Sequence, residues 1–250
     1  MSRRLLYPVL ALVAALLLSY GYTTTQKASR AASVAEIEAS LMKTDQAALF
    51  STIRQGYPAQ YDAFLQEIAD LSASGTLDGD LLQSMFDKTQ AFTTNLRREN
   101  AQYIRTAPLE AIRAMRQATL DVMITLQDRP DACLRFGLRG GNALQPGELS
   151  PAQMARINQA AELTFAALIA GRDQPVTNPP PQAGDRAAFL TAWRAATTPS
   201  DAVWAALQSG NGAPADLCSA FVSMERYILS DTSPLSTRML VDLTAQTVAN

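Results

Sequence analysis

The chain has 250 residues, a formal net charge of -2 and a sequence pI near 5.2, and 48% of its residues are apolar. These values are typical of a globular protein with enough apolar side chains for a sizeable core. The slight acidity argues against nucleic-acid binding, which needs a dense patch of lysine and arginine. The chain contains no histidine. This excludes histidine-based catalytic triads and histidine-ligated zinc or haem, and we expect no metal and no cofactor.

The N-terminal segment is typical of a membrane anchor. An uncharged stretch, residues 5–22, directly follows Arg3 and Arg4. As a helix this stretch would be about 27 Å long, close to the ~30 Å hydrocarbon core of a bilayer. We expect residues 1–26 to form a signal anchor, with the two arginines on the cytoplasmic side. Cleavage after Gly21, which would release the body of the protein into the periplasm, is the alternative.

Two further interpretations of the N-terminus are open. The start SRRLL resembles a twin-arginine export signal, but only over these few residues. The hydrophobic helix could also be buried in a soluble core. Both are secondary to the anchor, because the uncharged stretch is longer than the apolar region of a typical signal peptide.

Proline and glycine mark helix ends throughout the body of the chain. In one example Ser150 is a good N-cap, Pro151 suits the first helical position, and Gly171 suits the C-terminal stop. Between them apolar residues recur every three or four positions. No alternating β-branched run or Asn-Gly turn indicates a strand. We therefore predict an all-α protein, with one N-terminal hydrophobic helix and a globular domain of about nine to ten short helices.

These signals also give the predicted helices and domains. Helices are expected near residues 28–42, 45–55, 58–73, 80–106, 108–128, 130–139, 151–170, 185–196, 199–209, 214–230 and 234–247. The domains are expected to be a helical stalk at 27–43, a main helical domain at 44–172, a Pro-rich connector at 173–184, and C-terminal helices packed on the main domain at 185–250. The prolines of the connector favour a semi-rigid segment.

Tyr57 and Tyr61 form the first candidate site, on either side of Pro58 in the phrase RQGYPAQYDAFLQEI. A hydrophobic staple and a core contact explain two aromatic rings on adjoining turns. The alternative is an exposed aromatic contact for a partner or ligand, because tyrosine combines an apolar ring with a polar tip.

A mildly basic block forms the second candidate site. Residues 97–139 contain eight basic and five acidic residues. Arg105, Arg113 and Arg116 would lie near one face if the helices around Pro108 packed continuously. A solvated face is one interpretation. The other is a surface for an anionic ligand, a lipid headgroup or an acidic partner.

Cys133 and Cys218 are the two cysteines, and each begins a Cys-x-x-Phe step shortly after a proline. In an oxidising compartment the simplest expectation is a disulfide between them. Closing a loop of about 85 residues would stabilise the fold by roughly 4–5 kcal/mol in the chain-entropy model. Two buried free thiols, or a reactive thiolate at a helix N-terminus, are the alternatives.

Together these features predict a single-pass protein of the bacterial inner membrane with its body in the periplasm. No phosphate-binding glycine loop or nucleophile elbow indicates an enzyme, so we expect a protein-interaction or assembly component. Its partners would be the membrane, through residues 5–22, and a protein of the cell envelope. Binding of an apolar or amphipathic ligand is a second hypothesis. A carboxylate-dependent envelope hydrolase is a third, which requires two acidic residues facing each other across a cleft.

Overall fold

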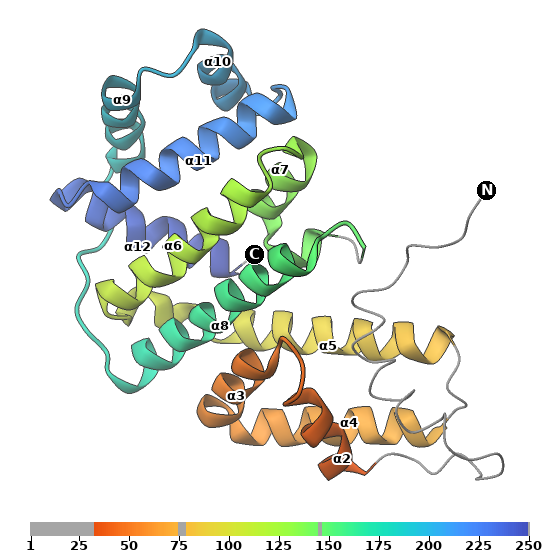
Figure 1. The fold of residues 1–250 in the computed structure, drawn as a ribbon. Helices are drawn as coiled ribbons and strands as arrows, with labels where there is room; N and C mark the ends of the chain where they lie inside the picture. Colours follow the sequence, from red (N-terminus) through yellow and green to blue (C-terminus); the bar gives the residue numbers. More distant parts are fainter. Residues whose placement is uncertain (1–32, 75–78, 145–146, 250) are drawn as a thin grey trace, which may run out of the picture. The chain divides into compact units, whose positions relative to one another are not determined.

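The computed structural model describes residues 33–74, 79–144 and 147–249 (Figure 1). These residues are helical and contain no strand, which confirms the all-α prediction. The predicted anchor, residues 1–26, lies outside the described residues. In the part of the chain that is described, no helix is both long enough and apolar enough to span a bilayer.

The helix ends lie close to most of the predicted ones, and proline begins α4, α7, α8, α11 and α12. In chain order the helices are α2 (Val34–Leu41), α3 (Ala47–Gly56), α4 (Pro58–Ser74), α5 (Gly79–Glu99), the 3-10 helix η1 (Ala101–Thr106), α6 (Leu109–Thr125), α7 (Pro130–Arg139), the 3-10 helix η2 (Gly141–Ala143), α8 (Pro151–Asp173), α9 (Asp185–Thr197), α10 (Asp201–Ser209), α11 (Pro214–Ser230) and α12 (Pro234–Ala249). Proline suits these starts because the first helical N–H has no intrahelical partner.

One predicted helix differs from the observed structure. Residues 80–106 form two elements, because α5 ends at Glu99 and the tighter η1 follows it. Ala107 then has an extended backbone, with ψ of 144°. Proline disfavours helical geometry in the residue before it, so Pro108 accounts for the extended Ala107 between η1 and α6.

The described residues divide into two compact units. Unit 1 contains those up to residue 96 together with those of 145–158, and unit 2 contains 97–144 and 159–249. In unit 1, α2 and α3 pack against α4. The rings of Phe50 and Phe64 stack with centroids 5.9 Å apart, and those of Phe64 and Phe92 with centroids 4.3 Å apart. These rings form the aromatic core of unit 1.

Unit 2 is built around α11 and α12. Helix α11 packs against α6, α7 and α10, whereas α12 packs against η1 and α9 (Figure 1). The largest fully buried side chains in this unit include Trp193, Ile112, Met123 and Ile228. Helices before and after the Pro-rich connector therefore share one apolar core.

The Pro-rich connector is held against the C-terminal end of η1 by hydrogen bonds to the main-chain carbonyls of Thr106 and Ala107. The N–H of Val176 donates to the carbonyl of Thr106 over 2.8 Å, and the Asn178 side-chain amide donates to the carbonyl of Ala107 over 2.8 Å. Next to the connector, Gly171 lies directly against the Tyr103 carbonyl, with no room for a Cβ atom. Glycine is therefore required where α8 meets η1.

Candidate functional site

Tyr57 and Tyr61 are buried in unit 1, so the expectation of an exposed aromatic surface is corrected. Tyr57 is the C-cap of α3, and Tyr61 lies on the inward face of α4 with its ring centroid 6.5 Å from that of Phe50. The core-packing interpretation is the one the structure shows. The Tyr61 hydroxyl has no hydrogen-bond partner among the described residues. Burial raises the pKa of Tyr61 to about 12, with a smaller contribution from Glu38.

Arg105, Arg113 and Arg116 do not share one solvated or docking face, because η1 and α6 are separate elements on either side of Pro108. The three side chains have different internal partners. Arg113 donates to the carbonyl of Leu229 at the end of α11 over 2.8 Å. A cation near a helix C-terminus stabilises the unpaired carbonyls and the helix dipole. This basic segment therefore helps to hold unit 2 together.

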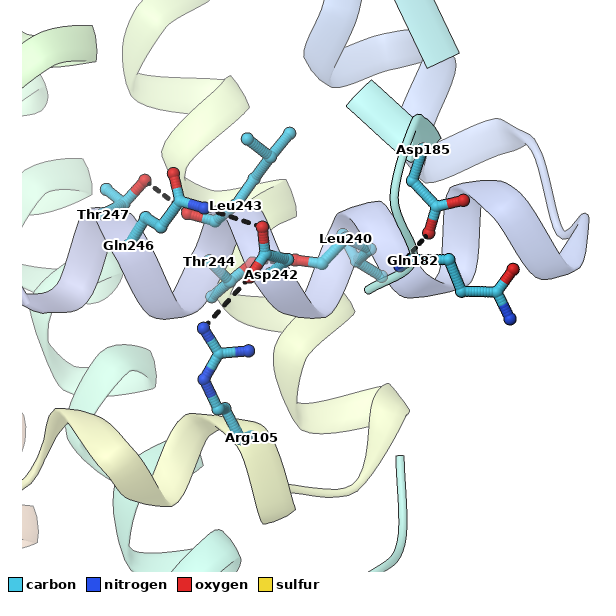
Figure 2. Close-up of polar contacts among 9 residues, drawn as sticks. All are labelled: Arg105, Gln182, Asp185, Leu240, Asp242, Leu243, Thr244, Gln246 and Thr247. Carbon is cyan, nitrogen blue, oxygen red and sulfur yellow. Dashed lines mark hydrogen bonds and ion pairs between the residues drawn. The ribbon is translucent and has the colours of Figure 1, made fainter. Parts of the chain in front are cut away.

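Arg105 ties η1 to α12, as Figure 2 shows. Its guanidinium donates to Asp242 over 3.0 Å, and the other Asp242 oxygen accepts from Gln246 over 2.6 Å. The Asp242 carboxylate is mostly buried whereas Arg105 is half exposed. An ion pair at the surface contributes little stability, so its main effect is to orient the two helices.

A second carboxylate holds the N-terminus of α9 against α12. Both Asp185 oxygens accept hydrogen bonds from Arg238, each over 2.7 Å. One of these oxygens also accepts a hydrogen bond from the Gln182 N–H, as Figure 2 shows. The Arg238 hydrogen bonds, followed by the Gln182 hydrogen bond, lower the pKa of Asp185 to about 2. The carboxylate also lies at the positive end of the α9 dipole, which favours its charge.

The most unusual polar pair of unit 2 is Arg116 on α6 with Glu225 on α11. Only 6% of the Arg116 side chain and 13% of the Glu225 side chain are exposed. One guanidinium nitrogen of Arg116 donates to Glu225, and another reaches the Thr247 hydroxyl at 3.5 Å. Within the described structure, Arg116 Nε and Glu225 Oε2 have no hydrogen-bond partner. The two charges are therefore buried but only partly satisfied.

Burial raises the pKa of Glu225 above its ordinary value, and the charge of Arg116 opposes this rise without cancelling it. A buried carboxyl with a raised pKa is found in general acids and also in structural ion pairs. The ion pair with Arg116 favours the structural role. Across the described ranges, no group of three His, Cys, Asp or Glu side chains could hold a metal ion.

Cys133 on α7 and Cys218 on α11 lie at disulfide distance, as predicted, with their Cα atoms 5.8 Å apart. The exposed fraction is 0% for Cys133 and 2% for Cys218. Such burial is not compatible with a nucleophile that meets a substrate in the folded protein. The pair links α7 to α11 near their N-terminal ends, although 85 residues separate the two cysteines in the sequence.

Sequence reasoning did not find Glu225, Asp185 or Asp242. The arginine partners of these three carboxylates are separated from them by 109, 53 and 137 residues. No local spacing could signal such pairs, because an acidic residue on a predicted helix is normally solvated.

No protein-family model matches this chain, and neither the curated proteins nor the solved structures include a significant match. The function is therefore argued from the chain's own residues.

Proposed function

We propose that this protein is a membrane-anchored, extracytoplasmic protein of the bacterial cell envelope that acts in protein interaction or assembly. The anchor in this proposal is residues 5–22, which are uncharged and follow two arginines. The body would lie in the periplasm, or be secreted there if the N-terminal segment is cleaved.

The Cys133 and Cys218 pair is the observation that supports the proposed periplasmic location. These are the two cysteines of the chain, and the fold brings them to disulfide distance although 85 residues separate them. Structural disulfides persist in oxidising compartments and are rare in a reducing cytoplasm. A buried pair with no exposed sulfur suits a structural bond better than a redox centre.

The proposed non-enzymatic role is supported by the way unit 2 uses its acidic groups. Asp231 lies between α11 and α12 and accepts hydrogen bonds from the Tyr227 hydroxyl of α11, from the N–H and hydroxyl of Ser233, and from the Ser236 hydroxyl at the start of α12. These bonds lower the pKa of Asp231, with the Ser233 N–H as the largest cause. A carboxylate held in its charged form at a helix junction is suited to fixing that junction rather than to proton transfer.

The test is capture of a partner by the full chain from cross-linked membranes, read by quantitative mass spectrometry. Arg97 donates to the carbonyls of Thr247 and Val248 at the end of α12, so the tag should follow a long linker. The control carries the anchor alone. A stoichiometric envelope protein that is captured by the full chain and not by the control is expected. Recovery of an intact body with no partner would contradict the interaction proposal.

One surface variant would map the contact. Leu138 near the end of α7 is 54% exposed, and Arg139 beside it is exposed as well. Leu138→Asp leaves the core unchanged, so loss of capture with an unchanged melting temperature would place the partner on α7. Apolar ligand binding stays a second hypothesis, and co-purified lipid detected by native mass spectrometry would favour it.

The proposed location is tested separately, by the oxidation state of Cys133 and Cys218 in cells and by the cell fraction in which the protein is found. In rapidly quenched and denatured cells, Cys133 and Cys218 should resist alkylation because they are joined in a disulfide. The protein should lie in the membrane fraction, or in the periplasmic fraction if the N-terminal segment is cleaved. Reduced thiols on a protein in the cytosolic fraction would overturn the proposed location.

A further inference from the structure

Helices α7 and α11 pack closely beside the cysteine pair, and we call this contact, between Gly137 on α7 and Phe221 on α11, the seam. Gly137 lies one turn after Cys133, and Phe221 lies nearly one turn after Cys218. A Cβ atom at Gly137 would be 3.0 Å from the Phe221 ring and 3.3 Å from the end of Met123. The two helices are therefore tightly packed at this level, and an added methyl group would require the Phe221 ring or the Met123 side chain to shift.

This packing determines how the bond can be made and broken. Thiol–disulfide exchange requires an attacking thiolate to reach a sulfur directly, through a mixed-disulfide intermediate. Cys133 has an exposed fraction of 0% and Cys218 of 2%, so neither sulfur offers that approach in the folded unit. Exchange must therefore wait for α7 and α11 to separate.

We infer that the Cys133–Cys218 disulfide is formed by exchange with a donor disulfide while the chain is incompletely folded. Folding then buries the bond and protects it from reduction. The thiolate of one cysteine attacks the donor disulfide and releases one donor thiolate. The thiolate of the other cysteine attacks the mixed disulfide, which forms the Cys133–Cys218 bond and releases the second donor thiolate. The two thiol protons pass to solvent, and the two electrons reduce the donor.

The inference rests on the oxidising location proposed above, because structural disulfides form and persist in oxidising compartments. It goes further in assigning a partner of stated chemistry, a dithiol-disulfide exchange reagent or enzyme that acts before folding. It also assigns the bond a permanent structural role. With two cysteines in the chain, no disulfide isomerisation within it is needed.

The first experiment measures reduction of the oxidised full chain by dithiothreitol, trapped by alkylation and followed by mass. In the native protein the rate should reach a plateau as dithiothreitol rises, because opening of the seam is limiting, and it should increase with urea in parallel with unfolding. A small dipeptide disulfide serves as the exposed reference. Native reduction as fast as that reference, with unchanged circular dichroism, would overturn the inference.

Two variants make the test specific to the seam. Phe221→Ala removes the ring that closes the seam and should raise the native reduction rate by roughly tenfold or more, since it weakens packing at the point of opening. Leu138→Ala truncates an exposed apolar side chain of α7 to the same residue and should leave the rate within about twofold. Equal reduction rates in the two variants would show that opening of the seam does not limit reduction of the disulfide.

The second experiment follows formation of the bond with oxidised glutathione as the donor. The reduced chain in urea should oxidise at least about tenfold faster, relative to a dithiol peptide in the same buffer, than the reduced chain refolded beforehand. Equal relative rates would contradict installation before folding. Both experiments use purified protein, so their failure would be distinct from a failure of the proposed location or partner.

Discussion

Arg116 and Glu225 are 109 residues apart in the chain and form an ion pair inside unit 2, where α6 meets α11. Each partner keeps one buried polar atom without a hydrogen bond to any of the described residues. Burying two charges costs free energy that one contact returns only in part. The pair therefore fixes how the two helices meet more than it stabilises them.

Removing one partner of this pair should be costly, because the other charge is left buried. We expect Arg116→Met or Glu225→Leu alone to lower the free energy of unfolding by roughly 3–5 kcal/mol, and the double variant to be much closer to the wild type. Urea unfolding followed by circular dichroism measures this. The matched control is the half-exposed pair of Lys88 and Glu67, where Lys88→Met should cost less than about 1 kcal/mol. A double variant as unstable as the single ones would contradict the argument.

Because the pKa of Glu225 is raised in the folded state, its contribution to the free energy of unfolding should decrease as the pH rises. Burial, the largest cause, raises the pKa of the folded state above the ordinary 4.5. As the pH rises above 4.5, the unfolded chain loses this proton before the folded chain does, so the stability contributed by Glu225 falls. The stability of the wild type relative to Glu225→Gln should therefore be greatest in acid and decrease as the pH rises through the folded pKa. A flat or opposite difference would show that Arg116 outweighs burial.

The contribution of Asp185 to stability should depend on pH in the opposite direction, increasing as the pH rises. Its hydrogen bonds with Arg238 and Gln182 hold its pKa at about 2, below the ordinary 3.8. The stabilising effect is present above pH 3.8 and is lost as the pH falls towards 2, because the folded state must then take up a proton it resists. The stability difference between the wild type and Asp185→Asn should shrink over this range in urea titrations. Comparing the two proteins cancels the effect of the other carboxylates.

The cysteine pair should contribute a large part of the stability. Replacing both Cys133 and Cys218 with serine removes the constraint on a loop of 85 residues. The chain-entropy model gives a loss of roughly 4–5 kcal/mol, seen as a lower urea midpoint. A second measurement compares the urea midpoints of the oxidised wild type and of the wild type reduced in its unfolded state. An equal midpoint for the oxidised and reduced proteins would show that the bond does not stabilise the fold.

Gly171 should not tolerate a side chain. A Cβ atom there would collide with the backbone carbonyl of Tyr103, which is held in η1 and cannot turn away as a side chain could. Gly171→Ala should destabilise the protein by about 1–3 kcal/mol despite the better helix propensity of alanine. Ala155→Ser, which adds one atom at an exposed position of the same helix, should change the thermal midpoint little. A stabilised Gly171→Ala protein would contradict the close approach.

The all-α class and most helix ends could be predicted from the sequence, because these features depend on neighbouring residues. Pro151 and Pro234 lack an N–H and have a fixed φ, so they mark the first turns of α8 and α12 from sequence alone. The division between α5 and η1 was missed. It depends on a tight 3-10 turn before Pro108, and apolar periodicity does not distinguish this turn from a continuing helix.

The cysteine pairing was also predictable, because a chain with two cysteines allows one intramolecular bond. The roles of the candidate side chains could not be predicted in this way, because they depend on how the helices pack. Tyr61 could equally have been a surface anchor, and Arg116 a solvated cation, until the fold buried them. The partner of Arg116 lies on a helix formed far along the chain. Burial and ion pairing depend on such distant neighbours, which local spacing does not encode.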